Sequence, residues 1–230
     1  MPCEWTIHRS STARLYSYIK GTKVNMEKSP DIVFLVHGLG GSRIDMWPLA
    51  RRLRRSGFEV KNWSYRTLGN RIETHANRLG NDLVKIDSQP VDRKIHIATH
   101  SMGGIITRSM LADFDIQNLG RIVMLVPPNQ GSHVARKVVR YFGWLTPSLQ
   151  QLSDAPNSFV NQLPNTLQQQ GIEFGIIEST KDRVIAQGGV HLDGYRDYAR
   201  LDIHHGVIQW YSQTIQLVEN FLHEGRFVTS

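Results

Sequence analysis

Short apolar runs alternate with segments of helical periodicity along most of the chain, and this alternation constrains the fold more than any other feature. Runs that are apolar throughout are typical of strands buried on both faces, as in a parallel sheet covered by helices. The pattern therefore predicts an α/β fold with three layers and a mostly parallel sheet. The expected strands are residues 32–36, 58–63, 95–99, 122–126, 173–177 and, more weakly, 198–203.

Amphipathic stripes occupy the segments between these runs. Met46, Leu49 and Leu53 share one face of a first helix, with Pro48 in its first turn. Apolar residues in 72–86 recur at intervals of three and four, a helix over 102–111 follows the third run directly, and apolar residues of 207–222 predict a closing helix. We expect a single domain over residues 1–230.

Composition excludes several classes of protein. With 40% apolar and 20% charged residues, the 230-residue chain is typical of a globular protein. Its longest purely apolar runs have five residues, whereas a membrane-spanning helix needs about 20. The formal charge is +7, with a basic cluster at Arg51, Arg52, Arg54 and Arg55. No nucleic-acid-binding motif accompanies this cluster, so we expect no nucleic acid partner. A solvated helix face and peripheral contact with an anionic membrane surface are the alternatives.

Cysteine use and the N-terminal residues bear on the cellular compartment. Cys3 is the only cysteine, so an intrachain disulfide cannot form, which favours a reducing compartment. The first twenty residues include charged side chains and no apolar stretch of the kind found in signal peptides. These features predict a cytoplasmic protein.

Residues 127–171 interrupt the alternation. This stretch holds five prolines and the apolar residues Phe142, Trp144 and Leu145. It follows the carboxyl end of a predicted strand, where α/β sheets bind ligands. A short helical lid and simple packing filler are the two interpretations, and the apolar side chains favour an acyl or lipid chain as ligand.

The sequence Thr99-His100-Ser101-Met102-Gly103-Gly104 lies between a predicted strand and a predicted helix. This context is typical of a nucleophilic serine on a tight turn, with the helix N-terminus favouring negative charge beside it. The pattern departs from G-x-S-x-G because Thr99 occupies the position of the first glycine. A helix-capping serine turn is the structural alternative.

The glycine-rich sequence His37-Gly38-Leu39-Gly40-Gly41 follows the first apolar run. Such a loop can supply one half of an oxyanion hole, and we expect the donors to be the backbone N–H groups of Leu39 and Met102. The spacing matches no nucleotide-binding glycine motif. His37 and Gly38 are expected beside the substrate, with His37 as a hydrogen-bonding residue of the loop rather than a base.

A nucleophilic serine needs a histidine base and an orienting carboxylate. In this topology they follow later strands, in the order serine, acid, histidine. Asp182 is the favoured acid, and Glu178, Asp193 and Asp197 are alternatives. His205 directly precedes a glycine and a predicted helix start and is favoured as the base, with adjacent His204 as the alternative.

The chain resembles the α/β-hydrolase superfamily, specifically its small lipase- and esterase-like serine hydrolases. The matching motifs extend from residue 37 to the closing helix: H-G-L-G-G at 37–41, M-W-P-L-A-R-R-L at 46–53, T-H-S-M-G-G at 99–104, P-P-N-Q-G-S at 127–132 and H-H-G-V-I at 204–208. The resemblance implies that residues 127–132 line the edge of the site, and that the family's glycine-to-histidine spacing, counted from Gly194, points to His205 as the base.

These features predict a serine hydrolase that cleaves small-molecule or lipid carboxylic esters through an acyl-enzyme on Ser101, without a cofactor. Thioesters or amides are alternative substrates, and a non-catalytic ligand-binding protein of the same fold is the alternative class. Histidines and aspartates crowd residues 191–205, but their spacing matches no zinc motif, so we expect no metal. Oligomeric state is left open.

Overall fold

The computed structural model describes residues 16–19, 22–25, 29–142, 146–167 and 171–228. Its main sheet has six strands in the order β4-β3-β5-β6-β7-β8, and every neighbouring pair is parallel. All six predicted strands are confirmed, with ends shifted by up to three residues. Their bounds are β3 Ile32–Val36, β4 Glu59–Trp63, β5 Ile95–His100, β6 Leu119–Leu125, β7 Phe174–Ser179 and β8 Asp197–Leu201.

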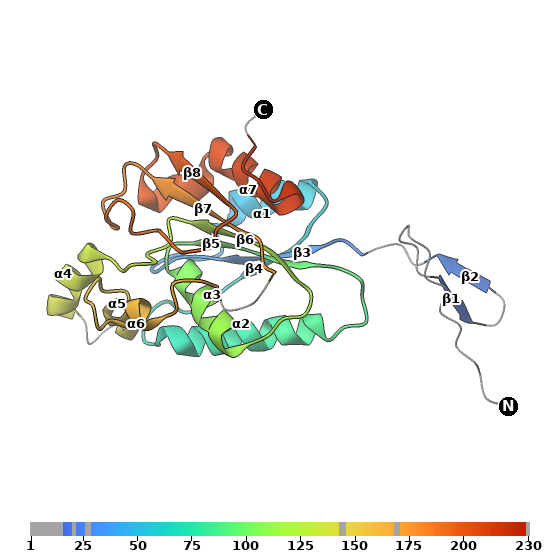
Figure 1. Ribbon diagram of the computed structural model, residues 1–230, viewed down its shortest axis with the longest axis horizontal. Helices are drawn as coiled ribbons and strands as arrows, with labels where there is room; N and C mark the ends of the chain where they lie inside the picture. The colour runs from blue at the N-terminus through green and yellow to red at the C-terminus, as the bar shows by residue number, and fades with distance from the viewer. Residues whose placement is uncertain (1–15, 20–21, 26–28, 143–145, 168–170, 229–230) are drawn as a thin grey trace.

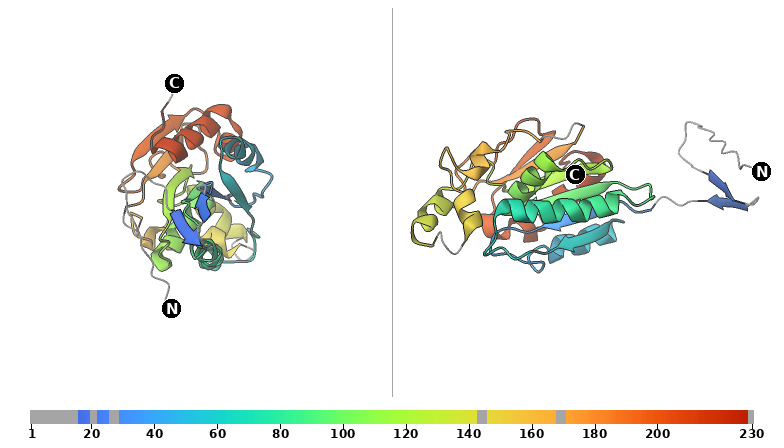
Figure 2. Two further views of the ribbon diagram at one scale, coloured as in Figure 1. Left: turned by 90° about the vertical axis from the view of Figure 1, so that its right-hand side faces the viewer. Right: turned by 90° about the horizontal axis from the view of Figure 1, so that it is seen from below.

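Helices cover both faces of this sheet and complete the predicted three layers (Figures 1 and 2). Helices α1 (Trp47–Arg55) and α7 (Ser212–Glu224) lie together on one face, and α2 (Ile72–Asp87) and α3 (Met102–Asp113) on the other. Strands β3, β5 and β7 are buried along their whole length, which explains why β3 is apolar on both sides and why β5 and β7 are mainly apolar.

Two parts of the fold differ from the sequence expectation. The antiparallel hairpin of β1 (Tyr16–Ile19) and β2 (Thr22–Asn25) has no counterpart among the predicted strands. The closing helix is interrupted: a 3-10 helix, η1 (His205–Trp210), precedes α7, and Tyr211 between them has extended backbone angles. This break follows from the site, because residue 205 must face the sheet edge while α7 packs on the sheet face.

Residues 127–171 contain three short helices, α4 (His133–Phe142), α5 (Pro147–Gln151) and α6 (Phe159–Gln162). They gather at the carboxyl end of the sheet (Figure 1). Arg108 on α3 anchors this segment, because its buried guanidinium donates to the carbonyl oxygens of Asn129 and Pro164, each at 2.9 Å. The lid interpretation of this segment stays a prediction, and Trp144 and Leu145 lie outside the described residues.

Candidate active site

Ser101 occupies a strained turn between β5 and α3. Its φ of 50° and ψ of −121° are unusual for a residue with a side chain. Strand β5 pairs with β3 on one side and β6 on the other, so this turn emerges at the middle of the sheet's carboxyl edge. The Ser101 N–H donates to Leu125 O at 2.9 Å, which ties the strained residue to β6.

The glycines after Ser101 let α3 lie close to the sheet. A Cβ on Gly103 would sit 2.3 Å from Val36 O, and one on Gly104 would sit 2.9 Å from Pro127 Cβ. Thr99, the departure from the glycine pattern, is fully buried in β5. Its hydroxyl oxygen would be only 3.4 Å from a Cβ on Gly104, so the bare backbone at 104 makes room for the threonine.

Ser101, His205 and Asp182 form one hydrogen-bonded chain. Ser101 Oγ lies 3.0 Å from His205 Nε2, and His205 Nδ1 lies 2.7 Å from Asp182 Oδ2. An ionised carboxylate only accepts hydrogen bonds, so Nδ1 carries the proton and Nε2 is left to accept from the serine hydroxyl. Residues from three different connections, after β5, β7 and β8, therefore meet at one point.

Asp182 is held as a carboxylate at the point where it meets His205. Its Oδ1 accepts from the backbone N–H groups of Val184 and Ile185, at 2.7 and 2.9 Å. Burial alone would raise the pKa of Asp182, but the hydrogen bond and charge of His205, with the two N–H donors, lower the pKa below its usual value. The group is therefore charged at neutral pH and can orient the imidazole.

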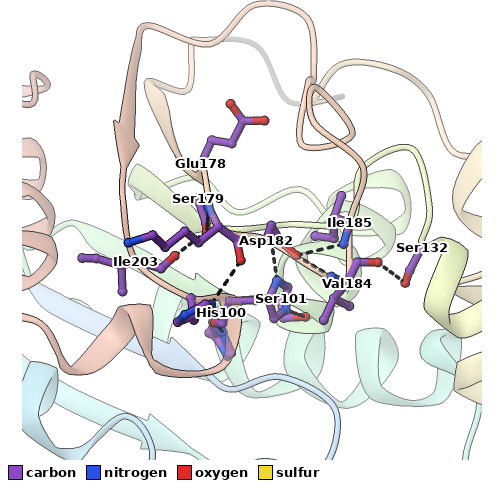
Figure 3. A network of polar contacts seen from close by, with 12 residues as sticks. His100, Ser101, Ser132, Glu178, Ser179, Asp182, Val184, Ile185 and Ile203 are labelled. Atoms are coloured by element: carbon purple, nitrogen blue, oxygen red, sulfur yellow. Dashed lines mark hydrogen bonds and ion pairs between the residues drawn. The ribbon is translucent and has the colours of Figure 1, made fainter.

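Two serines brace the loop that carries Asp182 (Figure 3). Ser132, from the segment after β6, donates to Val184 O at 2.6 Å. Ser179, at the end of β7, donates to Ile203 O and accepts from the N–H of Lys181. These bonds fix the loop against both neighbouring connections, so the position of the carboxylate does not depend on the loop alone.

The two expected oxyanion donors are free. Within the described residues, no hydrogen-bond acceptor pairs with the N–H of Leu39 or of Met102, the first residue of α3. Gly38 brings their loop against the turn, because a Cβ there would lie 3.0 Å from Ser101 Cβ. The Gly40 N–H is occupied, since it donates to Thr67 Oγ1. Two N–H groups without a partner thus belong to the segments that meet at Ser101, and their role as oxyanion donors stays a prediction.

Known proteins resemble this chain both in sequence and in fold. Residues 26–134 match the family described as "Putative serine esterase (DUF676)". Aspergillus fumigatus lipase B superposes with a TM-score of 0.66 at 15% identity, over 94% of this chain and 60% of that one. The chain has the α/β-hydrolase fold. Its first half is similar to that serine esterase family.

Two further structures share the fold of this chain. Bacillus licheniformis lipase BlEst2 in its mature form has a TM-score of 0.58 at 17% identity, over 79% of this chain and 86% of that one. Phospholipase PlaB from Legionella pneumophila, in complex with thio-NAD, has a TM-score of 0.54 at 19% identity, over 66% and 38%. This chain therefore spans less than two thirds of the length of PlaB and of the Aspergillus lipase. No curated protein matches its sequence.

The alternative acids and base lie in other hydrogen-bond networks. Glu178 accepts from Tyr198 and Arg200, Asp193 from Asn165, and Asp197 from the N–H of Phe227. His204 is exposed and its Nδ1 lies 3.3 Å from Lys181 O. The described residues include no group of three side chains able to hold a metal ion, and no described helix is long and apolar enough to cross a bilayer.

His37 is buried against Tyr65 at the start of the glycine loop, and its expected place beside the substrate stays a prediction. Its ring is fully buried and stacks on Tyr65, with centroids 4.3 Å apart. Its Nδ1 donates to Gly38 O at 3.0 Å, and the Tyr65 hydroxyl donates to His37 O at 2.6 Å. Burial lowers the pKa of His37, so the ring is neutral and supports the loop by packing and one hydrogen bond.

Sequence reasoning missed His100, a residue of the site that contacts His205. It is buried at the end of β5, and its Nε2 donates to His205 O at 3.0 Å. A Cβ on Gly38 would lie 3.0 Å from His100 Nδ1, so the same ring also contacts the glycine loop. Its place directly before Ser101 was the available signal, but sequence does not reveal a partner 105 positions away.

Proposed function

We propose that this α/β-hydrolase cleaves carboxylic esters through a covalent acyl-enzyme on Ser101. The observation that carries the proposal is the continuous hydrogen-bond chain from Ser101 Oγ through His205 to Asp182 Oδ2. A serine hydroxyl is a weak nucleophile by itself, and a base within hydrogen-bond reach is what activates it. The esterase family match over residues 26–134 supports the same chemistry.

In the first half of the reaction, Ser101 Oγ attacks the ester carbonyl carbon while His205 Nε2 takes the hydroxyl proton. The carbonyl electron pair moves onto oxygen, and the N–H groups of Leu39 and Met102 donate to this oxyanion. Losing one such donor typically costs about 3–4 kcal/mol in the transition state. The carbonyl then re-forms, the bond to the alcohol oxygen breaks, and His205 returns the proton to the leaving alcohol.

In the second half, water replaces the alcohol. His205 Nε2 takes a proton from the water as its oxygen attacks the acyl carbon on Ser101. Collapse of the second oxyanion breaks the bond to Ser101 Oγ, which recovers its proton from His205. The carboxylic acid leaves, and the charged Asp182 carboxylate stabilises the imidazolium that forms in each half.

Steady-state turnover of a p-nitrophenyl ester series by the wild type and by Ser101→Ala tests the proposal. The expected loss in kcat is about a millionfold, as when the nucleophile of a catalytic triad is removed. Ser109→Ala, which changes a buried serine of α3 away from the turn, is the matched control and should keep its turnover. Equal turnover by Ser101→Ala and wild type would refute the role of Ser101.

A further inference from the structure

An exposed apolar patch adjoins the site at the carboxyl end of the sheet. We call Ile44, Trp47 and Trp210 the Trp47 patch; their exposed fractions are 79%, 55% and 50%. Single exposed apolar residues are ordinary, but a group of them marks an interaction surface. These three belong together, because the Trp47 N–H donates to Ile44 O and Trp210 Nε1 donates to Asp45 O at 2.8 Å.

Cationic side chains border the Trp47 patch. The Arg51 guanidinium lies 5.6 Å from the centre of the Trp47 ring. Arg43 precedes Ile44, and with Trp47 it lines a groove of about 910 Å³ along β4. Arg54 and Arg78 line the same groove farther from the patch. Apolar and aromatic side chains with arginines at their edge are typical of surfaces that meet the lipid–water interface.

These arginines keep their charge unneutralised. Across the described part of the chain, no carboxylate lies within ion-pair distance of Arg43, Arg51, Arg54 or Arg78. The nearby acids have other partners. Asp45 accepts from the N–H and hydroxyl of Ser42, Asp82 contacts Trp63 and Lys85, and Glu59 pairs with Arg93 and Lys61. The surface around the patch is therefore positively charged.

The Trp47 patch is built from the same segments as the site. Trp210 is the last residue of η1, whose first residue is His205. Ile44 lies in the connection after β3 that also supplies Leu39. A flat partner that covers the patch would therefore lie against the two segments that supply Leu39 and His205 to the site.

We propose that the Trp47 patch, with Arg43 and Arg51, docks this α/β-hydrolase onto bilayers that contain anionic phospholipids. Ile44 and the two indole rings enter the headgroup region, and the arginines face lipid phosphates, where each basic residue adds to the attraction. Docking delivers a lipid ester to Ser101, and this consequence alone rests on the proposed function.

Co-sedimentation with vesicles tests the charge requirement. Wild-type protein is expected to bind vesicles of phosphatidylcholine and phosphatidylserine in equal parts, to bind phosphatidylcholine alone weakly, and to be released by salt. R43E/R51E should bind the anionic vesicles at least about 25-fold more weakly, since each lost cation contributes about fivefold and each glutamate adds repulsion. K94E/R226E is the matched control, because it makes the same charge change at exposed positions outside the patch and should retain binding.

The variant Ile44→Ser tests insertion: it should weaken vesicle binding and leave the salt dependence of binding unchanged. Val228→Ser is the control, because Val228 is an exposed apolar residue elsewhere, and it should not weaken binding. Equal losses in both charge-reversed proteins, or no vesicle binding by the wild type, would overturn the proposal. Binding to a short oligonucleotide in place of vesicles, lost in R43E/R51E alone, would also overturn it.

Turnover of a water-soluble p-nitrophenyl ester without vesicles separates docking from catalysis. It should be the same in the wild type and in both charge-reversed proteins. Absence of that turnover in the wild type would refute the proposed function and leave the vesicle result standing.

Discussion

The ring of His100 holds the backbone of His205: Nε2 of the first donates to the carbonyl oxygen of the second at 3.0 Å, and the two ring centres lie 5.4 Å apart. Burial, with the neighbouring charge of His205, lowers the pKa of His100 to about 4, so its ring is neutral and keeps the proton on Nε2. His100 is thus a positioning residue, which fixes the start of η1 relative to the Ser101 turn.

His100 acts through the position of His205 and not through contact with substrate, so replacing it should lower turnover. We expect His100→Ala to reduce kcat about 10- to 100-fold with little change in KM, because a small misplacement of the base is costly. His100→Gln, whose amide can donate to the same carbonyl, should recover part of the loss. Equal kcat values for the two variants, at equal thermal stability, would show that the hydrogen bond has no positioning role.

The variant Asp182→Asn tests the charge of the carboxylate separately from its size. The amide keeps the size of the carboxylate but cannot stabilise the imidazolium, so kcat should fall by about 10³–10⁴-fold. The same change at Asp193, which pairs with Asn165 and His191, should leave kcat unaltered. Esterase kinetics of both variants make the comparison, and a large loss from the change at 193 would contradict our choice of acid.

Gly103→Ala should strongly destabilise the fold. The added Cβ would lie 2.3 Å from Val36 O and 2.9 Å from His37 O, both backbone atoms that cannot rotate away. We expect a loss of about 3 kcal/mol or more in the free energy of unfolding. Gly206→Ala has open space around its Cβ and should change that free energy by less than about 1 kcal/mol. Urea titrations of the two variants decide; equal stabilities would refute the steric argument.

Buried histidines should make the protein sensitive to acid. Burial lowers the pKa of His96 from 6.5 to about 4, and its Nδ1 accepts from the Arg121 N–H at 2.8 Å. The unfolded chain therefore binds a proton at a pH where the folded chain does not. Stability is retained above about pH 6.5 and lost as pH falls toward 4, by about 1.4 kcal/mol per pH unit for each such proton.

His96→Asn removes one of these protons while keeping an acceptor for Arg121. The slope of unfolding free energy against pH, measured by urea titration between pH 6.5 and 4, should fall by about one proton. An unchanged slope in this variant would contradict a depressed pKa at His96.

The main sheet could be predicted from the sequence because its strands β3, β5 and β7 are buried along their whole length and are bounded by clear helical stripes. The apolar spacing of 207–222 predicts that Tyr211 lies within a helix. Spacing does not report that residue 205 must face a different direction from the helix α7 that follows. The strands of the β1–β2 hairpin have only four residues each, which is too short for an alternating pattern to indicate a strand.

Within the site, the order of serine, acid and histidine narrowed the candidates to a few residues. The choice among acids depends on side-chain direction in one loop, where Val184 and Ile185 turn the carboxylate of Asp182 toward His205. Supporting contacts such as Ser132 to Val184 join residues 52 positions apart and leave no trace in local sequence.

Labelling with a fluorophosphonate, followed by peptide mass spectrometry, measures the reactivity of each serine directly. The wild type should carry one phosphonyl group, on the peptide that contains Ser101, and His205→Ala should label far more slowly. A phosphonyl group on another serine, or equal labelling of Ser101 in the presence and absence of the His205 imidazole, would contradict the activated nucleophile on which the account depends.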